Sequence, residues 1–220
     1  MESMELMRAR HSVRKFTAQK IEPEKVEQLQ VEIEAINRES GLFFAVVTDN
    51  EDVFKASQPS YGSFSGCRNF FLLFGDKKAD EQVGYYGERL VLFAQSLGLN
   101  TCWCALTFEK KAIPVAAPEG MKLFIVVALG YGETQGVPHK NKPLEKLAKL
   151  TNQTPPWFKQ GMEAAMLAPT AVNQQRFRFE QVSERGVRAK ALLGPCYKID
   201  LGIVKYHFEL GAGRENFNWE

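Results

Sequence analysis

The sequence GYYGERLVLFAQSLGL, residues 84–99, decides the fold of this chain. Its apolar side chains fall on more than one face of a helix, which is typical of a helix that is buried on several sides. Gly98 stands where such a helix would end, because glycine is common just after the last helical turn. We therefore predict a largely buried central helix over residues 83–99, around which the other elements pack.

On both sides of this helix the chain alternates between amphipathic segments and short apolar runs. Residues 23–40 predict a helix, since apolar side chains recur there every three or four positions after Pro23. Apolar runs without polar alternation predict buried strands. These runs occupy 42–48, 69–74 and 122–129, with a short extended piece at 100–105 and a Gly- and Ser-rich loop at 59–66. The alternation predicts an α/β or α+β sandwich.

The chain starts again after residues 151–156, a polar segment that ends in two prolines and is the best linker candidate. The elements expected after it are a helix at 158–167, a strand at 177–182 and a helix at 199–210. Pairing Gly87 with Gly202, and Phe93 with Phe208, gives one shift, 202 − 87 = 115. These pairs indicate an internal repeat, although helix-strand-helix order also arises by chance.

The composition is that of an ordinary globular protein. Of 220 residues, 45% are hydrophobic and 25% charged, and 28 basic against 26 acidic side chains leave a charge of +2. Such a balance provides no global field for nucleic acid or an acidic membrane. The longest apolar stretch, residues 123–129, is too short to span a membrane, and MESMELMRAR lacks the apolar core of a signal peptide. We therefore expect a cytoplasmic protein with no nucleic-acid or membrane partner.

The cysteines and histidines give no sign of a metal site or a disulfide framework. Four cysteines and three histidines are scattered along the chain without the paired spacing of zinc ligands. Cys102 and Cys104 flank Trp103 on a predicted strand, and this C-x-C lacks the C-x-x-C arrangement of redox thiols. We expect buried structural cysteines and no metal.

Three polar clusters are candidates for ligand binding. Residues 10–14, RHSVR, combine two guanidiniums with a hydroxyl, which suits a phosphate. Lys140 and Lys142 could add charge to the same anion, and the amides of APTAVNQQ, residues 168–175, could read the edge of a polar heterocycle. Each cluster also has a plainer interpretation: a solvated basic surface, a wet loop before a helix, and a turn that follows a helix.

Several segments together resemble the FMN-dependent nitroreductase family. RHSVRKF at 10–16 is similar to its opening R-R-S-x-R-x-F, and APTAVNQQ resembles its A-P-S-x-x-N-x-Q. GYYGERLVLFAQSLGLNTCW at 84–103 is similar to the central helix and the G-L-G-x-x-W turn of the family. APEGMKLFIVVALGYGE and KNKPLEKL resemble its strand and its basic-proline segment near the C-terminus. The likeness implies an α+β fold, with a central, mostly antiparallel sheet flanked by helices.

The order of the motifs departs from ordinary members of that family. There the amide motif comes just after the first helix, whereas here it follows the basic segment, late in the chain. This arrangement is similar to a single-chain subgroup in which one polypeptide mimics the family's homodimer. The resemblance thus implies two pseudo-symmetric halves in one compact fold, residues 1–150 and the shorter 151–220, with further dimerisation left open.

The resemblance implies a cofactor site that draws on all three clusters. The residues expected near the phosphate and the ribityl chain are Arg10, His11, Ser12 and Arg14, with Lys140 and Lys142 completing the anion clamp. Asn173 and Gln175 would meet the ribityl chain or the polar edge of the ring, and Pro169 and Thr170 would shape their turn. Trp103, Cys104 and Ala105 would lie along the isoalloxazine.

Two departures affect the expected ring contacts. Ala105-Leu106 replaces the glycines that are usual in the family, and Arg176-Phe177 replaces the usual Pro-Trp. The implied activity is nevertheless that of an FMN-dependent NAD(P)H oxidoreductase, in which hydride passes through flavin N5 to a small acceptor in a ping-pong cycle and no side chain acts as a nucleophile. The alternatives are a non-catalytic flavin- or ligand-binding protein, or a related flavin enzyme that performs reductive dehalogenation or flavin destruction.

Overall fold

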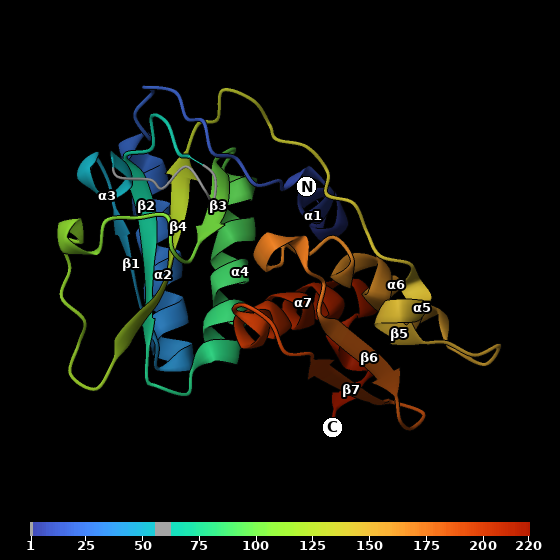
Figure 1. The fold of residues 1–220 in the computed structure, drawn as a ribbon. Coiled ribbons are helices and arrows are strands. Elements are labelled where there is room, and N and C mark those ends of the chain that lie inside the picture. The colour runs from blue at the N-terminus through green and yellow to red at the C-terminus, as the bar shows by residue number, and fades with distance from the viewer. Residues whose placement is uncertain (1, 56–62) are drawn as a thin grey trace.

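Two four-stranded sheets lie on opposite sides of a pair of long helices, α4 (Asp80–Ser96) and α7 (Tyr197–Ala212) (Figure 1). The structure is a computed structural model that describes residues 2–55 and 63–220. Residues 59–62 of the predicted loop at 59–66 therefore lie outside the described residues. Among the helices that are described, none is long and apolar enough to span a membrane.

The first sheet is antiparallel throughout, with strand order β1-β2-β4-β3. Its strands are β1 (Phe43–Val47), β2 (Asn69–Gly75), β3 (Asn100–Cys104) and β4 (Lys122–Gly130), and its helices are α2 (Pro23–Ser40), α4 and the short α3 (Asp52–Lys55). Every residue of β2 is buried, because alternate side chains enter hydrophobic clusters on both faces of the sheet. The predicted α+β class with a mostly antiparallel sheet is confirmed.

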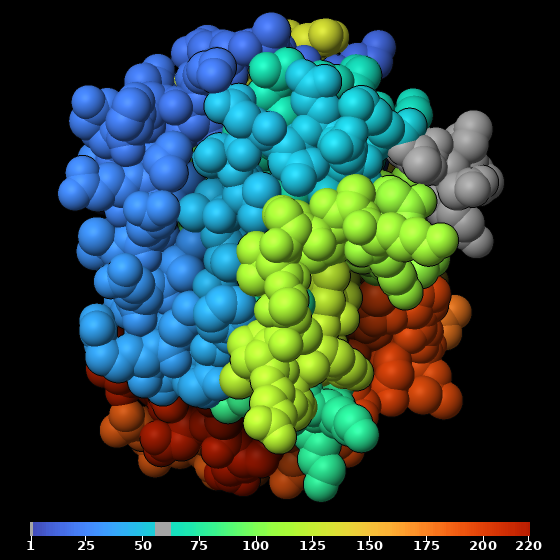
Figure 2. All heavy atoms as spheres, turned by 90° about the vertical axis from the view of Figure 1, so that its left-hand side faces the viewer, coloured from blue at the N-terminus to red at the C-terminus, as the bar shows by residue number. Residues whose placement is uncertain are grey.

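One face of the first sheet packs on α2 and α4, and irregular chain covers the other face. Phe71 and Leu73 of β2 point toward the helices, whereas Phe70 and Leu72 point toward the irregular cover. Figure 2 shows the light green residues 105–121 lying across this second face. They include the 3-10 turn Lys110–Ala112 and contribute partly buried apolar side chains to the cluster.

The second sheet has strand order β5-β6-β7-β8 and mixes parallel with antiparallel pairs. Its strands are β5 (Ala148–Lys149), β6 (Phe177–Gln181), β7 (Gly186–Ala191) and β8 (Asn218–Trp219). They pack against α5 (Leu144–Leu147) and α7, and α6 (Pro156–Ala165) packs on α7. Aromatic rings fill the space beneath the helices, with Phe208 stacked on Phe179 and edge-on to Phe158 and Phe217. β5 pairs with β6 although it precedes residue 151.

The crossing of α4 and α7 is made by two glycines in reciprocal positions. A Cβ on Gly84 would overlap the carbonyl oxygen of Ile199, and a Cβ on Gly202 would overlap that of Glu81. Each glycine thus contacts the residue three positions before the other, and the matching shift is 202 − 84 = 118. The predicted pairing of Gly87 with Gly202 is wrong, because Gly87 faces the Trp103 ring of its own sheet.

The order of elements around these helices is repeated. Helix, two antiparallel strands and a long helix follow one another as α2, β1, β2 and α4, with the short α3 between β1 and β2, and again as α6, β6, β7 and α7, with a 3-10 turn at Ala171–Asn173 between α6 and β6. The predicted repeat of helix and strand at 23–48 and 155–182 agrees with this order. The division into halves at residue 150 stays a prediction.

Two irregular segments run along one edge of the first sheet. The segment after α1 (Ser3–Ala9) runs beside β3, where the Val13 amide donates to the carbonyl of Thr101 over 3.0 Å. The segment after β4 crosses from the first sheet to α5, and its Gly132 pairs with Phe16 on the way. Figure 1 shows both at the top of the molecule, the first in blue and the second in yellow.

Candidate functional site

The predicted phosphate-binding residues lie where these two segments run side by side. A Cβ on Gly136 would lie only 2.7 Å from the His11 Cβ and 3.3 Å from the Ser12 carbonyl oxygen, so the backbone at 136 packs directly on that cluster. His139 is close enough to His11 for its charge to lower the pKa of His11. The structure thus brings residues 10–14 and the basic segment that begins at His139 together.

The lowered pKa of His11 indicates a positive electrostatic potential around it. Burial lowers its pKa first, and the charges of Arg10 and then His139 lower it further. Arg14 and Lys140 are exposed, and no ion pair between described residues involves Arg14, Lys140 or Lys142. A concentration of cations without paired carboxylates is an environment in which an anion gains energy.

The amide-bearing turn at 170–175 docks on the same basic segment. The Asn173 and Gln175 side-chain amides both donate to the Lys140 carbonyl, over 2.9 and 2.8 Å. In return the Lys142 amide donates to Gln175 Oε1 over 2.9 Å, and Lys142 Nζ donates to the Gln174 carbonyl over 2.6 Å. In this structure the two predicted amides therefore hold the lysine segment in place.

The backbone of this turn is strained. Val172, Asn173 and Gln175 all have left-handed φ values, 47°, 53° and 43°, which non-glycine residues rarely adopt and a β-branched residue least of all. Thr170 helps to hold the turn, because its hydroxyl accepts from the Gln175 backbone amide over 3.0 Å. Pro169 precedes it, four residues after the end of α6. Val172 nevertheless points outward and is 80% exposed.

Asp200, which sequence reasoning missed, anchors the turn from the first turn of α7. Its carboxylate accepts from the Ala171 amide at 3.0 and 3.1 Å and from the Gln174 amide at 2.7 Å. Burial raises the pKa of Asp200 to about 6, against the opposing effect of these hydrogen bonds. No signal in the sequence distinguishes this aspartate from those on the surface.

The end of β3 lies beside residues 10–14, because Ser12 bridges Thr101. Cys102 and Cys104 are buried, and burial raises the pKa of both thiols, as expected for structural cysteines. The Trp103 side chain points toward the core, where its indole Nε1 donates a hydrogen bond to Oε2 of the buried Glu88 over 2.9 Å. Ala105 is half-buried, and Leu106, which follows it, is 67% exposed.

Arg10 differs from the other predicted phosphate ligands because it is directed into the core. Its guanidinium is 3% exposed and lies 3.6 Å from Glu88 Oε1, measured from Nε. Neither Nε nor Nη1 has a hydrogen-bond partner among the described residues, and the buried Thr101 hydroxyl beside Ser12 also lacks one. The accessible donors of His11, Ser12 and Arg14 would suit the phosphate of FMN, whereas the buried Arg10 guanidinium could act on it only through its charge.

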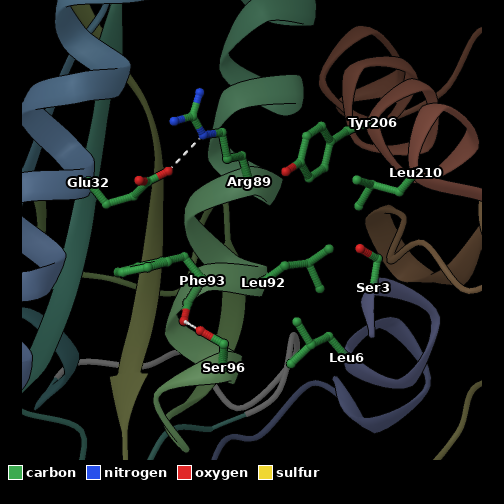
Figure 3. Close-up of a pocket in the computed structure, with 9 residues that line it drawn as sticks. All are labelled: Ser3, Leu6, Glu32, Arg89, Leu92, Phe93, Ser96, Tyr206 and Leu210. Carbon is green, nitrogen blue, oxygen red and sulfur yellow. Dashed lines mark hydrogen bonds and ion pairs between the residues drawn. The ribbon is translucent and has the colours of Figure 1, made fainter. Parts of the chain in front are cut away.

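Two pockets on the protein surface lie away from the predicted cofactor-binding residues. Figure 3 shows a groove of about 190 Å³ between α1, α2, α4 and α7, where Arg89 is paired with Glu32 over 2.7 Å. A second hollow of about 280 Å³ lies beside Arg68. Neither contains a predicted site residue. Within the part of the chain that the structure describes, no cluster of His, Cys, Asp or Glu could hold a metal ion.

Comparison with known proteins identifies the family. The family model described as "Putative TM nitroreductase" matches residues 2–212. The chain belongs to this family. No curated protein matches it. The resemblance inferred from the motifs is thereby confirmed.

Solved structures of nitroreductases share the fold. A putative nitroreductase from Thermotoga maritima is 22% identical, with a TM-score of 0.71 over 98% of this chain and 85% of that one. A nitroreductase family protein from Clostridium difficile is 19% identical, with a TM-score of 0.51 over 70% of this chain and 99% of that one. A nitroreductase-like protein from Streptococcus mutans is 17% identical, with a TM-score of 0.54 over 68% of this chain and 98% of that one. Of these three nitroreductases, the one from Thermotoga covers both sheets.

Proposed function

We propose that this nitroreductase-family protein is an FMN-dependent NAD(P)H oxidoreductase that reduces a small acceptor in a ping-pong cycle. The observation that carries the proposal is the meeting of residues 10–14, the Lys140 to Lys142 segment and the 170–175 turn at one place. These three segments are far apart in the sequence, yet they are the ones whose motifs the family resemblance connects with FMN.

The polar and cationic side chains of the site would bind the phosphate from different sides. Ser12 and His11 offer short, partly buried donors, whereas Arg14, Lys140 and Lys142 are exposed and can close on an anion from outside. Arg10 would add its charge from below, since it is buried beside this cluster. Residues 1–150 would thus contribute the clamp, and residues 151–220 would contribute the turn that positions it.

The wall of the site that faces the flavin would be formed by Pro169, Thr170, Asn173 and Gln175. Its floor would be formed by Trp103, Cys104 and Ala105. FMN held at this site would supply hydride transfer between NAD(P)H and the acceptor. The protein itself would position the flavin and keep competing reactants away from it. A buried Cys104 thiol with a raised pKa takes no part as a nucleophile.

The proposal is tested by the visible absorption of the protein after incubation with FMN and removal of the excess. We expect flavin bands near 450 nm, of the kind that bound flavin gives, and bleaching on anaerobic addition of NADH or NADPH. Bands that stay unbleached with both reductants would contradict the reductase and favour the non-catalytic flavin-binding alternative. A protein that remains colourless would exclude both.

A further inference from the structure

A buried polar cluster joins the two halves directly behind the candidate site. It consists of Arg10, Glu88 on α4, Trp103 on β3 and His207 on α7. The side chains of Glu88 and His207 are fully buried, and that of Arg10 is 3% exposed. Burying charges is costly unless they are paired, so the protonation of this cluster must be decided by its own partners.

Hydrogen-bond geometry fixes where the protons lie. His207 Nδ1 is 3.1 Å from the Ala164 carbonyl oxygen, which only accepts, so this nitrogen carries a proton. His207 Nε2 is 2.9 Å from Glu88 Oε1, and two facing lone pairs would repel, so a second proton lies between these atoms. Trp103 donates to the other oxygen, Oε2, over 2.9 Å. With that second proton, His207 and Glu88 together are neutral.

The charge that remains is therefore that of Arg10. Its Nε is 3.6 Å from Glu88 Oε1 and makes no hydrogen bond to it. Arg89, on the same helix as Glu88, is neutralised by Glu32 and Glu39, each at 2.7 Å. Tyr206, beside His207 on α7, stays uncharged because burial raises its pKa to about 12. Arg10 thus keeps its positive charge. The electrostatic effect of this charge extends to His11, whose pKa it lowers.

We propose that His207 is a positioning residue that neutralises Glu88 and so leaves the Arg10 charge available to the anion site. Without His207, the Glu88 carboxylate would pair with Arg10 alone and cancel its charge. A residue of the second half would then control anion binding in the first. This inference rests on the proposed function, since the anion is taken to be the phosphate of FMN.

The inference is tested with inorganic phosphate and FMN as separate probes, on the whole protein. The chain has three histidines, so their ring nitrogens can be followed individually by ¹⁵N NMR. In the wild-type protein we expect His207 Nδ1 to be protonated, and Nε2 to share one further proton with Glu88 Oε1. Phosphate should shift the His11 resonances in a saturable way, and FMN should bind at the same place.

Variants separate charge control from mere packing. His207→Gln should raise the dissociation constant for phosphate several-fold, because the freed Glu88 carboxylate would cancel the Arg10 charge near the anion. Glu88→Gln combined with His207→Gln removes the carboxylate that would cancel Arg10, and it should regain most of the affinity. A role limited to packing predicts the opposite order, with the double variant weaker than the single one.

Several results would overturn the inference. They are the absence of a shared proton between His207 Nε2 and Glu88 Oε1 in the wild-type protein, unchanged phosphate affinity in His207→Gln, no recovery in the double variant, and no effect of phosphate on His11. Because the first and last of these are measured on the wild-type protein, a variant that fails to fold does not prevent the test. If phosphate binds as expected but FMN does not, the proposed function fails while the charge assignment stands.

Discussion

Replacing Gly202 by valine should lower the free energy of unfolding by about 3 kcal/mol or more, the upper range for forcing extra atoms into a packed interior. The side chain would overlap the Glu81 carbonyl oxygen and lie 2.6 Å from the Tyr85 amide nitrogen, both of them backbone atoms of α4. The two helices would have to separate, and they carry the contact between the sheets. Thermal unfolding should show a fall in Tm of about 6–12 °C for a chain of this size.

Gln82→Val is the matched control, because Gln82 is exposed on α4 two positions before Gly84. It introduces the same β-branched side chain into a helix, which should cost less than about 1 kcal/mol. Gly84→Val should resemble Gly202→Val, since the contacts of the two glycines are reciprocal. If Gly202→Val proved no worse than Gln82→Val, the close crossing of α4 and α7 would be contradicted.

Replacing Lys142 by methionine should weaken FMN binding by about 10- to 100-fold, as expected when hydrogen bonds from a charged group worth about 1.5–3 kcal/mol are removed. Besides its charge, Lys142 Nζ makes hydrogen bonds to the carbonyls of Gln174 and Gln175, at 2.6 and 3.2 Å. Its loss would therefore free the strained turn from the basic segment. Quenching of flavin fluorescence on titration measures the change.

Lys140→Met provides the comparison, because Lys140 is exposed and its ammonium makes no hydrogen bond or ion pair to another described residue. Removing an exposed charge of this kind is worth about 0.2–1 kcal/mol, so the affinity should fall about fivefold at most. Equal losses in both variants would show that only charge matters. The cross-link made by Lys142 would then have no part in FMN binding.

The regular elements followed from local patterns in the sequence. The predicted helix at 23–40 coincides with α2, because Pro23 occupies its first turn and Gly41 ends it with a φ of 72°. The buried strands were recognisable because both of their faces are apolar. β7 was missed, since GVRAKA places charged residues among few apolar ones. A short strand with one solvent-exposed face gives only a weak pattern of alternating apolar residues in the sequence.

The site was predictable only where its residues form a motif. Residues 10–14 and 168–175 could be singled out in the sequence, and the structure places both against the basic segment. The left-handed backbone of Val172 could not be foreseen, because nothing in its neighbourhood favours that conformation for a β-branched residue. Likewise, no local pattern reveals that Glu88 and His207, 119 residues apart, share a hydrogen bond.

The most direct test of the account is a calorimetric titration of the wild-type protein with FMN and, separately, with riboflavin. The two ligands differ only in the phosphate, which we place among Ser12, Arg14 and Lys142. We expect riboflavin to bind at least about 30-fold more weakly than FMN, because two or more charge-assisted hydrogen bonds are lost. Equal affinity for both ligands, or binding of neither, would contradict the anion clamp on which the account rests.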